Sequence, residues 1–367
     1  MTSTIAKDLR THLRNSLEMS KESQKQVAAK LGVSSSYLSK FLNGKDISFW
    51  IVREVIKYID KENEMELIIM YFKEGISSKN IPAVLEYCYS KQLYGLTSEL
   101  AQEYINKKNP KTQELCSIYS LMLESRFMFE KSSFLDTLGN IKTNFLESEI
   151  IIKVLQVYYY YLNGLYDLTI YTIDQINDLL IQINDPFLKM AYSARLDEIQ
   201  VNIYLKQKVQ TIQSRKIANR ILDRDFSTAH NITAYHILAL SYFLESYEYS
   251  ISYYLKCIDL YSAFPDRQAE MIENKEEIAF LQKYWNKKIH DDFIVSDFTK
   301  LLKNDDELSS YYKVERYNKY ALFFDGIKES SSEKLLLSHH YFSKSNDHFR
   351  ACFPKNELNR IGFRYTL

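Results

Sequence analysis

The feature of this sequence that most limits its possible folds is how rarely the chain is interrupted. Only 8 of its 367 residues are glycine and 5 are proline. Turns and sheet connections depend on these residues, so their scarcity favours long helices with short connections. Hydrophobic residues make up 46% of the chain, which is enough for a large core and excludes general disorder. The sequence therefore predicts an all-α protein.

The interruptions that do occur are spaced in a way that is typical of helical hairpins. After the first part of the chain, clusters of Gly, Pro, Asn, Asp and Ser separate segments of about 15 to 25 residues, a suitable length for antiparallel helices. We expect helices to break at residues 77–80, 107–110, 138–140, 163–164, 184–186, 264–266, 325–326 and 353–354.

A weak internal repeat supports this interpretation. Residues 161–166, 204–209 and 242–247 each combine the end of an aromatic-rich helix with a short turn, and they start 43 and 38 residues apart. Tetratricopeptide repeats have a period of about 34 residues, and related helical repeats are somewhat longer. Because one hairpin cannot bury its own apolar face, neighbouring hairpins must stack. We expect a right-handed superhelix of degenerate tetratricopeptide-like hairpins with a concave groove.

Residues 24–44 carry the most specific pattern in the chain, a helix followed by a tight turn and a second helix. Val27 and Leu31 lie four residues apart and share one face of the first helix. Gly32 stands where that helix must end, and Ser34 can accept a hydrogen bond from the free N–H groups of the next helix. The pattern resembles the helix-turn-helix of the phage-repressor (Cro/C1) class, whose second helix lies in the major groove of DNA.

The exposed side of this helix-turn-helix supplies the candidate DNA contacts. Short hydroxyls can bond to base edges and phosphates, and an ammonium can pair with a phosphate. The predicted DNA-binding residues are Gln24, Lys25, Ser34, Ser35, Ser36, Tyr37, Ser39 and Lys40. Amphipathic helices at residues 4–19 and 47–60 are expected to complete a DNA-binding domain of residues 1–62. Residues 63–367 would then form a separate helical-repeat domain, to which the groove residues and the resemblance described below assign peptide sensing and dimerisation.

The charge distribution separates these two parts, although the net charge of the chain is zero. Residues 1–57 contain ten Lys and Arg against five Asp and Glu, and the remaining residues carry the matching surplus of negative charge. A basic head on an acidic body is expected of a protein that contacts DNA only through its head. The alternative is a scaffold whose helix-turn-helix no longer binds DNA.

Catalytic and metal-binding motifs are absent from the sequence. It has no P-loop, no dinucleotide-binding glycine pattern, no nucleophile elbow and no H-E-x-x-H pair. Cys88, Cys116, Cys257 and Cys352 are scattered and lack C-x-x-C spacing. No apolar run approaches the ~20 residues of a membrane span, and the first residues lack a secretory signal. We expect a cytoplasmic protein that is not an enzyme and has no cofactor, metal or membrane partner.

Polar residues on the predicted inner helices are candidates for binding a peptide in the groove. Arg195 and Asn202 lie seven residues apart, about two helical turns, and so share one face. An Asn side chain can pair with a peptide amide, and an Arg can clamp a terminal carboxylate. Asn231 and Tyr235, near the start of the next inner helix, are further candidates. The alternative is that these side chains bond between helices or face solvent.

A repressor-class helix-turn-helix followed by degenerate tetratricopeptide repeats resembles the peptide-responsive regulators of Gram-positive bacteria and their phages. Within that group the sequence is most similar to the arbitrium peptide receptors (AimR-type) of temperate phages. The similarity is carried by short stretches at residues 191–196, 201–203, 304–308 and 341–349. The shared architecture covers nearly the whole chain.

The resemblance implies a phage-encoded transcription regulator that binds double-stranded operator DNA as a homodimer in the host bacterial cell. A short imported peptide, typically ending Arg-Gly-Ala, would bind in the repeat groove and control the lysis–lysogeny decision. The resemblance places Asn202 at a peptide-binding asparagine and makes Asp347 a carboxylate partner for the arginine of the peptide. The alternative function is a bacterial peptide-responsive regulator whose repeat body sequesters a partner protein.

Overall fold

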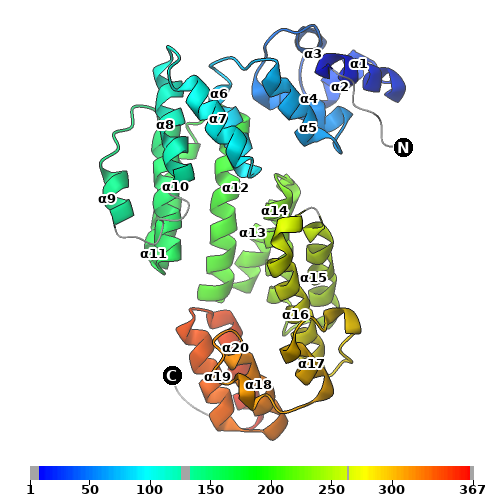
Figure 1. Cartoon of the computed structure of the whole chain (residues 1–367), viewed down its shortest axis with the longest axis vertical. Coiled ribbons are helices and arrows are strands. Elements are labelled where there is room, and N and C mark those ends of the chain that lie inside the picture. Colours follow the sequence, from blue (N-terminus) through cyan, green and yellow to red (C-terminus); the bar gives the residue numbers. More distant parts are fainter. Residues whose placement is uncertain (1–7, 125–132, 263, 364–367) are drawn as a thin grey trace. The chain divides into compact units, whose positions relative to one another are not determined.

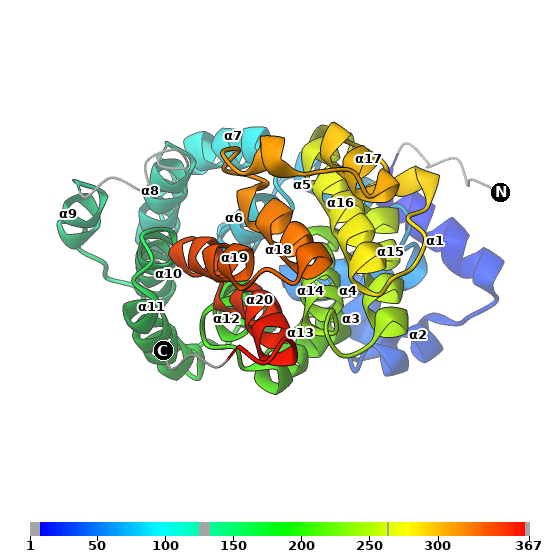
Figure 2. The same ribbon diagram turned by 90° about the horizontal axis from the view of Figure 1, so that it is seen from below.

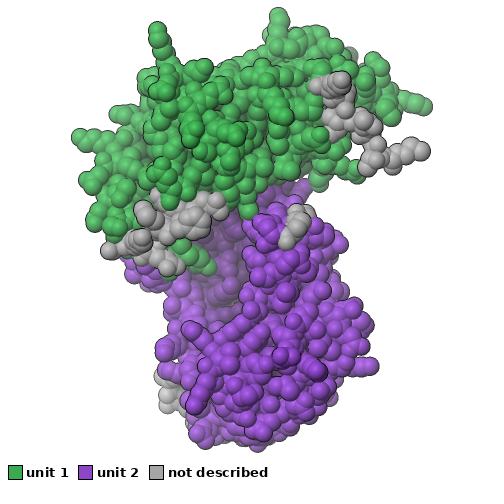
Figure 3. Space-filling model, viewed as in Figure 1, with its two compact units in different colours: residues 1–162, 171–193 green, residues 163–170, 194–367 purple. Residues whose placement is uncertain are grey.

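The computed structural model of the chain describes residues 8–124, 133–262 and 264–363. All regular elements in these residues are helices, which confirms the predicted all-α fold (Figure 1). The chain forms two compact units, which Figure 3 shows in different colours. Unit 1 comprises residues 1–162 and 171–193, and unit 2 comprises residues 163–170 and 194–367. None of the described helices is long and apolar enough to cross a membrane.

Unit 1 begins with five short helices that contain the predicted helix-turn-helix. They are α1 (Leu9–Ser20), α2 (Gln24–Lys30), α3 (Ser35–Leu42), α4 (Phe49–Ile59) and α5 (Glu64–Lys73). The helices expected at residues 4–19 and 47–60 correspond to α1 and α4, although residues 4–7 lie outside the described part. Asp8 caps α1, because its Oδ2 accepts a hydrogen bond from the Thr11 backbone N–H at 2.8 Å.

The rest of unit 1 shares its core with these first helices. It contains α6 (Ile81–Ser90), α7 (Tyr94–Tyr104), α8 (Pro110–Glu124), α9 (Ser133–Gly139), α10 (Leu146–Leu162), most of α11 (Tyr166–Leu180) and the start of α12 (Pro186–Asn202). The Phe49 ring of α4 lies edge-on to Tyr87 of α6 and to Phe187 of α12, with ring centroids 5.5 and 5.3 Å apart. All three side chains are fully buried. Aromatic packing therefore joins the helix-turn-helix part to the first helices of the body.

Unit 2 consists of successive helices that pack on their neighbours along the chain (Figures 1 and 2). After the end of α12 come η2 (Ile203–Gln207), α13 (Thr211–Arg224), α14 (Thr228–Ser241), α15 (Tyr247–Tyr261), η3 (Pro265–Arg267), α16 (Gln268–Tyr284), η4 (Asp291–Phe293), α17 (Asp297–Asn304), η5 (Ser309–Tyr311), α18 (Asn318–Glu329), α19 (Ser332–Lys344) and α20 (His348–Arg360). The hairpins α13–α14, α14–α15, α18–α19 and α19–α20 make the largest contacts. This is the stacking that the repeat pattern predicts.

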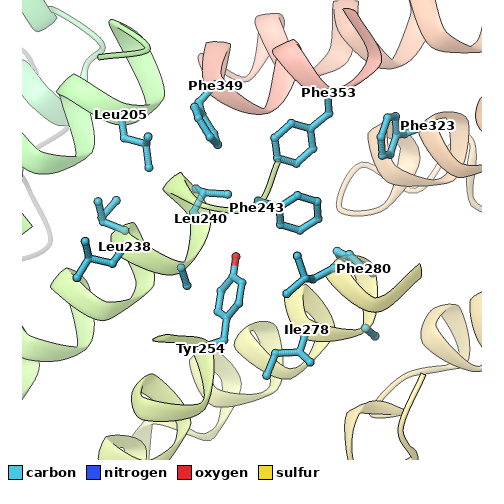
Figure 4. Packing of buried hydrophobic residues seen from close by; sticks show 14 of the residues in the cluster. Leu205, Leu238, Leu240, Phe243, Tyr254, Ile278, Phe280, Phe323, Phe349 and Phe353 are labelled. Carbon is cyan, nitrogen blue, oxygen red and sulfur yellow. The ribbon is translucent and has the colours of Figure 1, made fainter. Parts of the chain in front are cut away.

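The core of unit 2 is rich in aromatic rings that come from distant parts of the chain (Figure 4). Phe243, which follows α14, stacks on Phe353 of α20 with a centroid distance of 4.7 Å. Phe323 of α18 and Tyr284 of α16 pack around the same pair. Stacked and edge-on rings of this kind stabilise a core beyond the area that they bury. The high Tyr and Phe content therefore serves helix packing here.

Two of the expected helix breaks are wrong. Residues 325–326 lie inside α18, and residues 353–354 lie inside α20. A Cβ atom on Gly326 would lie 2.9 Å from Leu335 Cγ, so this glycine allows α18 and α19 to approach closely. Pro354 is buried together with Phe353 in α20. In both places tertiary packing overrides the local preference for a break.

We predict that Gly326→Ala lowers the free energy of unfolding by about 1–2 kcal/mol, because the added methyl would overlap the Leu335 side chain and backbone. Urea unfolding measures this effect. Gly95→Ala is the matched control, because Gly95 is helical and a Cβ there has no atom within 4 Å. The control should be neutral or slightly stabilising. Equal stability of the two variants would contradict the role of Gly326 as a packing residue.

Candidate functional site

The turn between α2 and α3 has the local geometry that the sequence predicts. Gly32 has a φ of +67°, which glycine adopts without strain. The Val33 backbone N–H donates to the Ala28 carbonyl at 2.9 Å. Ser34 Oγ accepts a hydrogen bond from the Tyr37 N–H at 3.2 Å and so caps α3. These short-range bonds hold α3 at a fixed angle to α2.

The predicted DNA-binding residues lie on or beside α3 and at the start of α2. Six of them are exposed, namely Gln24, Lys25, Ser34, Ser35, Ser36 and Lys40. Tyr37 and Ser39 are partly buried and have bonds within the protein. The Tyr37 hydroxyl accepts from the Ser48 N–H at 3.2 Å, and Ser39 Oγ accepts from Asn43 Nδ2 at 3.2 Å. Tyr37 therefore ties α3 to the start of α4.

The surface charge near α3 differs from the simple count along the sequence. Arg53 is 2% exposed and bonds to Glu54 and Glu64, and Arg10 forms an ion pair with Glu74. These two guanidinium groups stabilise the fold and are not available to DNA. Lys45, which sequence reasoning did not select, is exposed just beyond α3. The turn at Gly44, with a φ of +80°, brings it there.

A cluster of charged side chains is the most unusual feature of unit 2. Arg350 of α20 is 7% exposed, and its guanidinium donates to Glu277 Oε1 at 2.8 Å and to Asp347 Oδ2 at 2.6 Å. The Tyr320 hydroxyl also donates to Glu277 Oε1, at 2.9 Å. Burial alone would raise the pKa of Asp347, but the charges of Arg350 and Lys206 hold it below its ordinary value. We call Arg350, Glu277, Asp347, Lys206 and Lys319 the charged cluster.

The two lysines of the charged cluster have different surroundings. Burial and the charge of Arg350 lower the pKa of both. Lys319 Nζ donates to Ser345 Oγ at 3.3 Å. The Lys206 ammonium has no hydrogen bond or ion pair with any described residue, although its side chain is partly buried.

His236 of α14 lies near the charged cluster and is uncharged at neutral pH. Burial lowers the pKa of His236 to about 3, and the positive charges of Lys206 and Arg350 contribute. Its Nδ1 lies 3.0 Å from Asn274 Oδ1, so the ring donates from this nitrogen. The histidine thus adds no positive charge to the cluster.

The five predicted peptide-binding residues all lie in unit 2, but only Asp347 belongs to the charged cluster. Arg195 is 4% exposed on α12. Asn202 is partly buried, and its Nδ2 donates to the Glu198 carbonyl of the same helix at 3.0 Å. Asn231 Nδ2 donates to Asp225 Oδ1 at 2.9 Å, while its own Oδ1 is buried without a hydrogen-bond partner in the described residues. Tyr235 stacks on Tyr253.

Sequence reasoning did not select Glu277, Arg350 or Lys206. Glu277 and Arg350 are 73 positions apart, and no local pattern links them. Asp347 was selected through the resemblance, but its bond to Arg350 was not foreseen. The sequence offered one indication of this ion pair, because Asp347 and Arg350 are three residues apart and such pairs can meet on a helix.

Comparisons with known proteins match the chain to two protein families. The model of a family described as AimR transcriptional regulator-like matches residues 64–360, and a helix-turn-helix family model matches residues 13–61. The AimR transcriptional regulator of Bacillus phage phi3T is 23% identical over 376 residues, which cover 93% of this chain and 96% of the relative. The AimR transcriptional regulator of Bacillus phage SPbeta is 22% identical over 357 residues, 89% of each chain.

Solved structures with the same fold are also found. A selenomethionine form of phAimR superposes with a TM-score of 0.77 at 19% identity, covering 97% of each chain. A structure of phAimR with ligand has a TM-score of 0.66 at 19% identity, and the match covers 86% of this chain and 98% of the other. At these identities the likeness establishes the shared helical fold.

We predict that His236 makes the protein less stable as the pH falls. The pKa of His236 is about 3 in the folded state and near 6.5 in the unfolded chain, so the unfolded state takes up the proton first. The contribution of neutral His236 to the free energy of unfolding is therefore fully present above about pH 6.5, and it decreases as the pH falls below that value. Between pH 8 and pH 5 the loss from this residue is on the order of 2 kcal/mol.

Urea unfolding of His236→Gln at both pH values tests this prediction, because the variant should lose less stability than the native chain. His340→Gln is the control, since His340 is exposed and lies outside the charged cluster. Parallel losses in the native chain and in His236→Gln would show that another group is responsible.

Proposed function

Because the chain belongs to the AimR transcriptional regulator-like family, we propose that it binds operator DNA through α3 and is switched by a short imported peptide bound in unit 2. In this proposal the protein acts in the cytoplasm of a host bacterial cell and controls the lysis–lysogeny decision of a phage. The observation that carries the proposal is the combination of an intact helix-turn-helix with a body that matches this family over residues 64–360.

The exposed face of α3 supports the DNA-binding part of the proposal. Ser35 and Ser36 stand at the N-terminal end of α3, where recognition helices contact base edges. Lys25 and Lys40 are exposed beside them and are placed to pair with phosphates. As a homodimer, two such helices would bind half-sites about one helical turn, or a multiple, apart. The homodimer is thus part of the proposal.

The charged cluster and the side-chain amides of Asn231 and Asn202 support the peptide-binding part. A peptide ending Arg-Gly-Ala would bring an arginine towards Asp347, which already accepts two hydrogen bonds from Arg350. The peptide guanidinium would share this carboxylate or displace Arg350. The buried Oδ1 of Asn231 needs a donor, which a peptide N–H supplies. Asn202 Oδ1 is a further acceptor on α12.

Control of DNA binding by the peptide would follow from a difference in the affinity of the peptide for two arrangements of the protein. A ligand changes an equilibrium only when it binds one arrangement of the protein better than the other. We infer that the peptide favours one packing of the helical hairpins and so changes the spacing of the two α3 helices in the dimer. DNA binding responds because half-site spacing is fixed by the DNA.

The DNA-binding proposal predicts that Ser36→Ala combined with Lys40→Ala weakens operator binding at least about tenfold, because base-edge and phosphate contacts are lost together. The DNA probe is a duplex selected from a randomised library with the native protein, and affinity is measured by fluorescence anisotropy. Lys108→Ala, an exposed charge far along the chain in unit 1, is the control. Unchanged binding by the double variant, with its fold intact by circular dichroism, would favour a scaffold.

The peptide-binding proposal predicts that one member of a panel of synthetic hexapeptides ending Arg-Gly-Ala binds tightly in a calorimetric titration. Asn202→Ala should remove this binding, because an amide partner for the peptide backbone is lost. Asn219→Ala on the exposed side of α13 is the matched control. If no peptide in the panel gives heat, the peptide-receptor proposal is wrong, whereas the DNA-binding proposal is unaffected.

A further inference from the structure

The connection between α3 and α4 is held at its far end by contacts with both helices. Residues 43–48 form this connection and lie outside both helices. The Ser48 backbone N–H donates to the Tyr37 hydroxyl of α3 at 3.2 Å. The next residue, Phe49, begins α4 and is fully buried. Because Ser48 directly precedes Phe49, a shift of Phe49 would also shift α3.

Asn80, directly before α6, fixes the same connection to the rest of unit 1. It is 4% exposed, and its Oδ1 accepts a hydrogen bond from the Phe49 N–H at 3.1 Å. Its Nδ2 donates to the Ile47 carbonyl at 2.7 Å and to Asp46 Oδ1 at 3.0 Å. One buried side-chain amide thus bonds to backbone groups on both sides of Ser48. Removing it would leave buried polar groups without partners, which is costly.

Phe187, in the first turn of α12, is the second anchor of this connection. Its fully buried ring lies edge-on to Phe49 with a centroid distance of 5.3 Å. The Arg53 guanidinium of α4 lies 5.9 Å from the centroid of the same ring. Edge-on ring pairs and cation–π contacts have preferred geometries, so they fix direction as well as distance. The first turn of α12 therefore holds the N-terminal half of α4.

The helix that carries this anchor continues into unit 2. α12 is one α-helix, and its residues 186–193 belong to unit 1 whereas residues 194–202 belong to unit 2. Its second half contains Arg195 and Asn202, two of the candidate peptide-binding residues. Coupling between distant sites is carried by packed side chains, hydrogen bonds and rigid secondary elements. The same helix holds candidate ligand-binding residues at one end and the anchor of the helix-turn-helix at the other.

We propose that Phe187 and Asn80 are positioning residues for DNA recognition, which fix α3 to the first turn of α12 and so set the spacing of the two α3 helices in the dimer. This inference rests on the proposed function, because it assumes a homodimer on two half-sites and a peptide that controls it. Neither residue contacts DNA. A change in α12 reaches α3 through packed side chains and the Ser48–Tyr37 hydrogen bond.

The first test measures how strictly the protein distinguishes half-site spacings, without any peptide. The probes are the duplex selected from the randomised library and the same duplex with one base pair inserted between its half-sites, a shift of about 3.4 Å. The native protein should bind the longer duplex on the order of tenfold more weakly. In Phe187→Leu and in Asn80→Ala this difference should fall to about twofold, because α3 is held less firmly.

Phe134→Leu is the matched control for a general loss of packing. Phe134 of α9 is 1% exposed in unit 1, and its ring lies 6.5 Å from that of Tyr159 in α10. This variant removes a buried ring from the same unit and should keep the full difference between the two duplexes. An equal loss of spacing selectivity in Phe134→Leu and Phe187→Leu would overturn the inference, because reduced stability would then explain both.

The second test measures the ratio of operator affinities with and without the tightest-binding hexapeptide of the panel. Phe187→Leu should bring this ratio close to one, while the Kd of the peptide stays within about twofold of the native value. An unchanged ratio, or unchanged spacing selectivity in both Phe187→Leu and Asn80→Ala, would overturn the inference and leave the proposed function intact. If the native protein selects no duplex from the library, the proposed function and this inference fail together.

Discussion

The contacts of one guanidinium organise the polar interior of unit 2. Arg350 of α20 bonds to Glu277 of α16, and Glu277 in turn accepts a hydrogen bond from Tyr320 of α18. Three helices that are distant along the chain are thereby joined at one buried charge. Removing one member of such a network leaves uncompensated charge in a partly dry environment, which costs several kcal/mol. The stacked hairpins therefore depend on this group as well as on the surrounding aromatic core.

The DNA-facing part of the chain is organised by short-range bonds instead. Gly32, Ser34 and the Val33 N–H set the angle between α2 and α3 within a few residues. Phe49 then anchors this module to the core of unit 1. As a result the exposed serines and Lys40 of α3 are held in place by packed neighbouring helices.

The difference between short-range bonds in the helix-turn-helix and long-range contacts in unit 2 explains which features the sequence could predict. The helix-turn-helix, its cap at Ser34 and most helix breaks follow from local spacing, and they were predicted. Gly326 and Pro354 were misjudged because their roles depend on α19 and on the aromatic core, which no local pattern describes. The partners of Arg350 were missed for the same reason. Charges counted along the sequence also failed to show that Arg53 is buried. Long-range pairing carries no local signal.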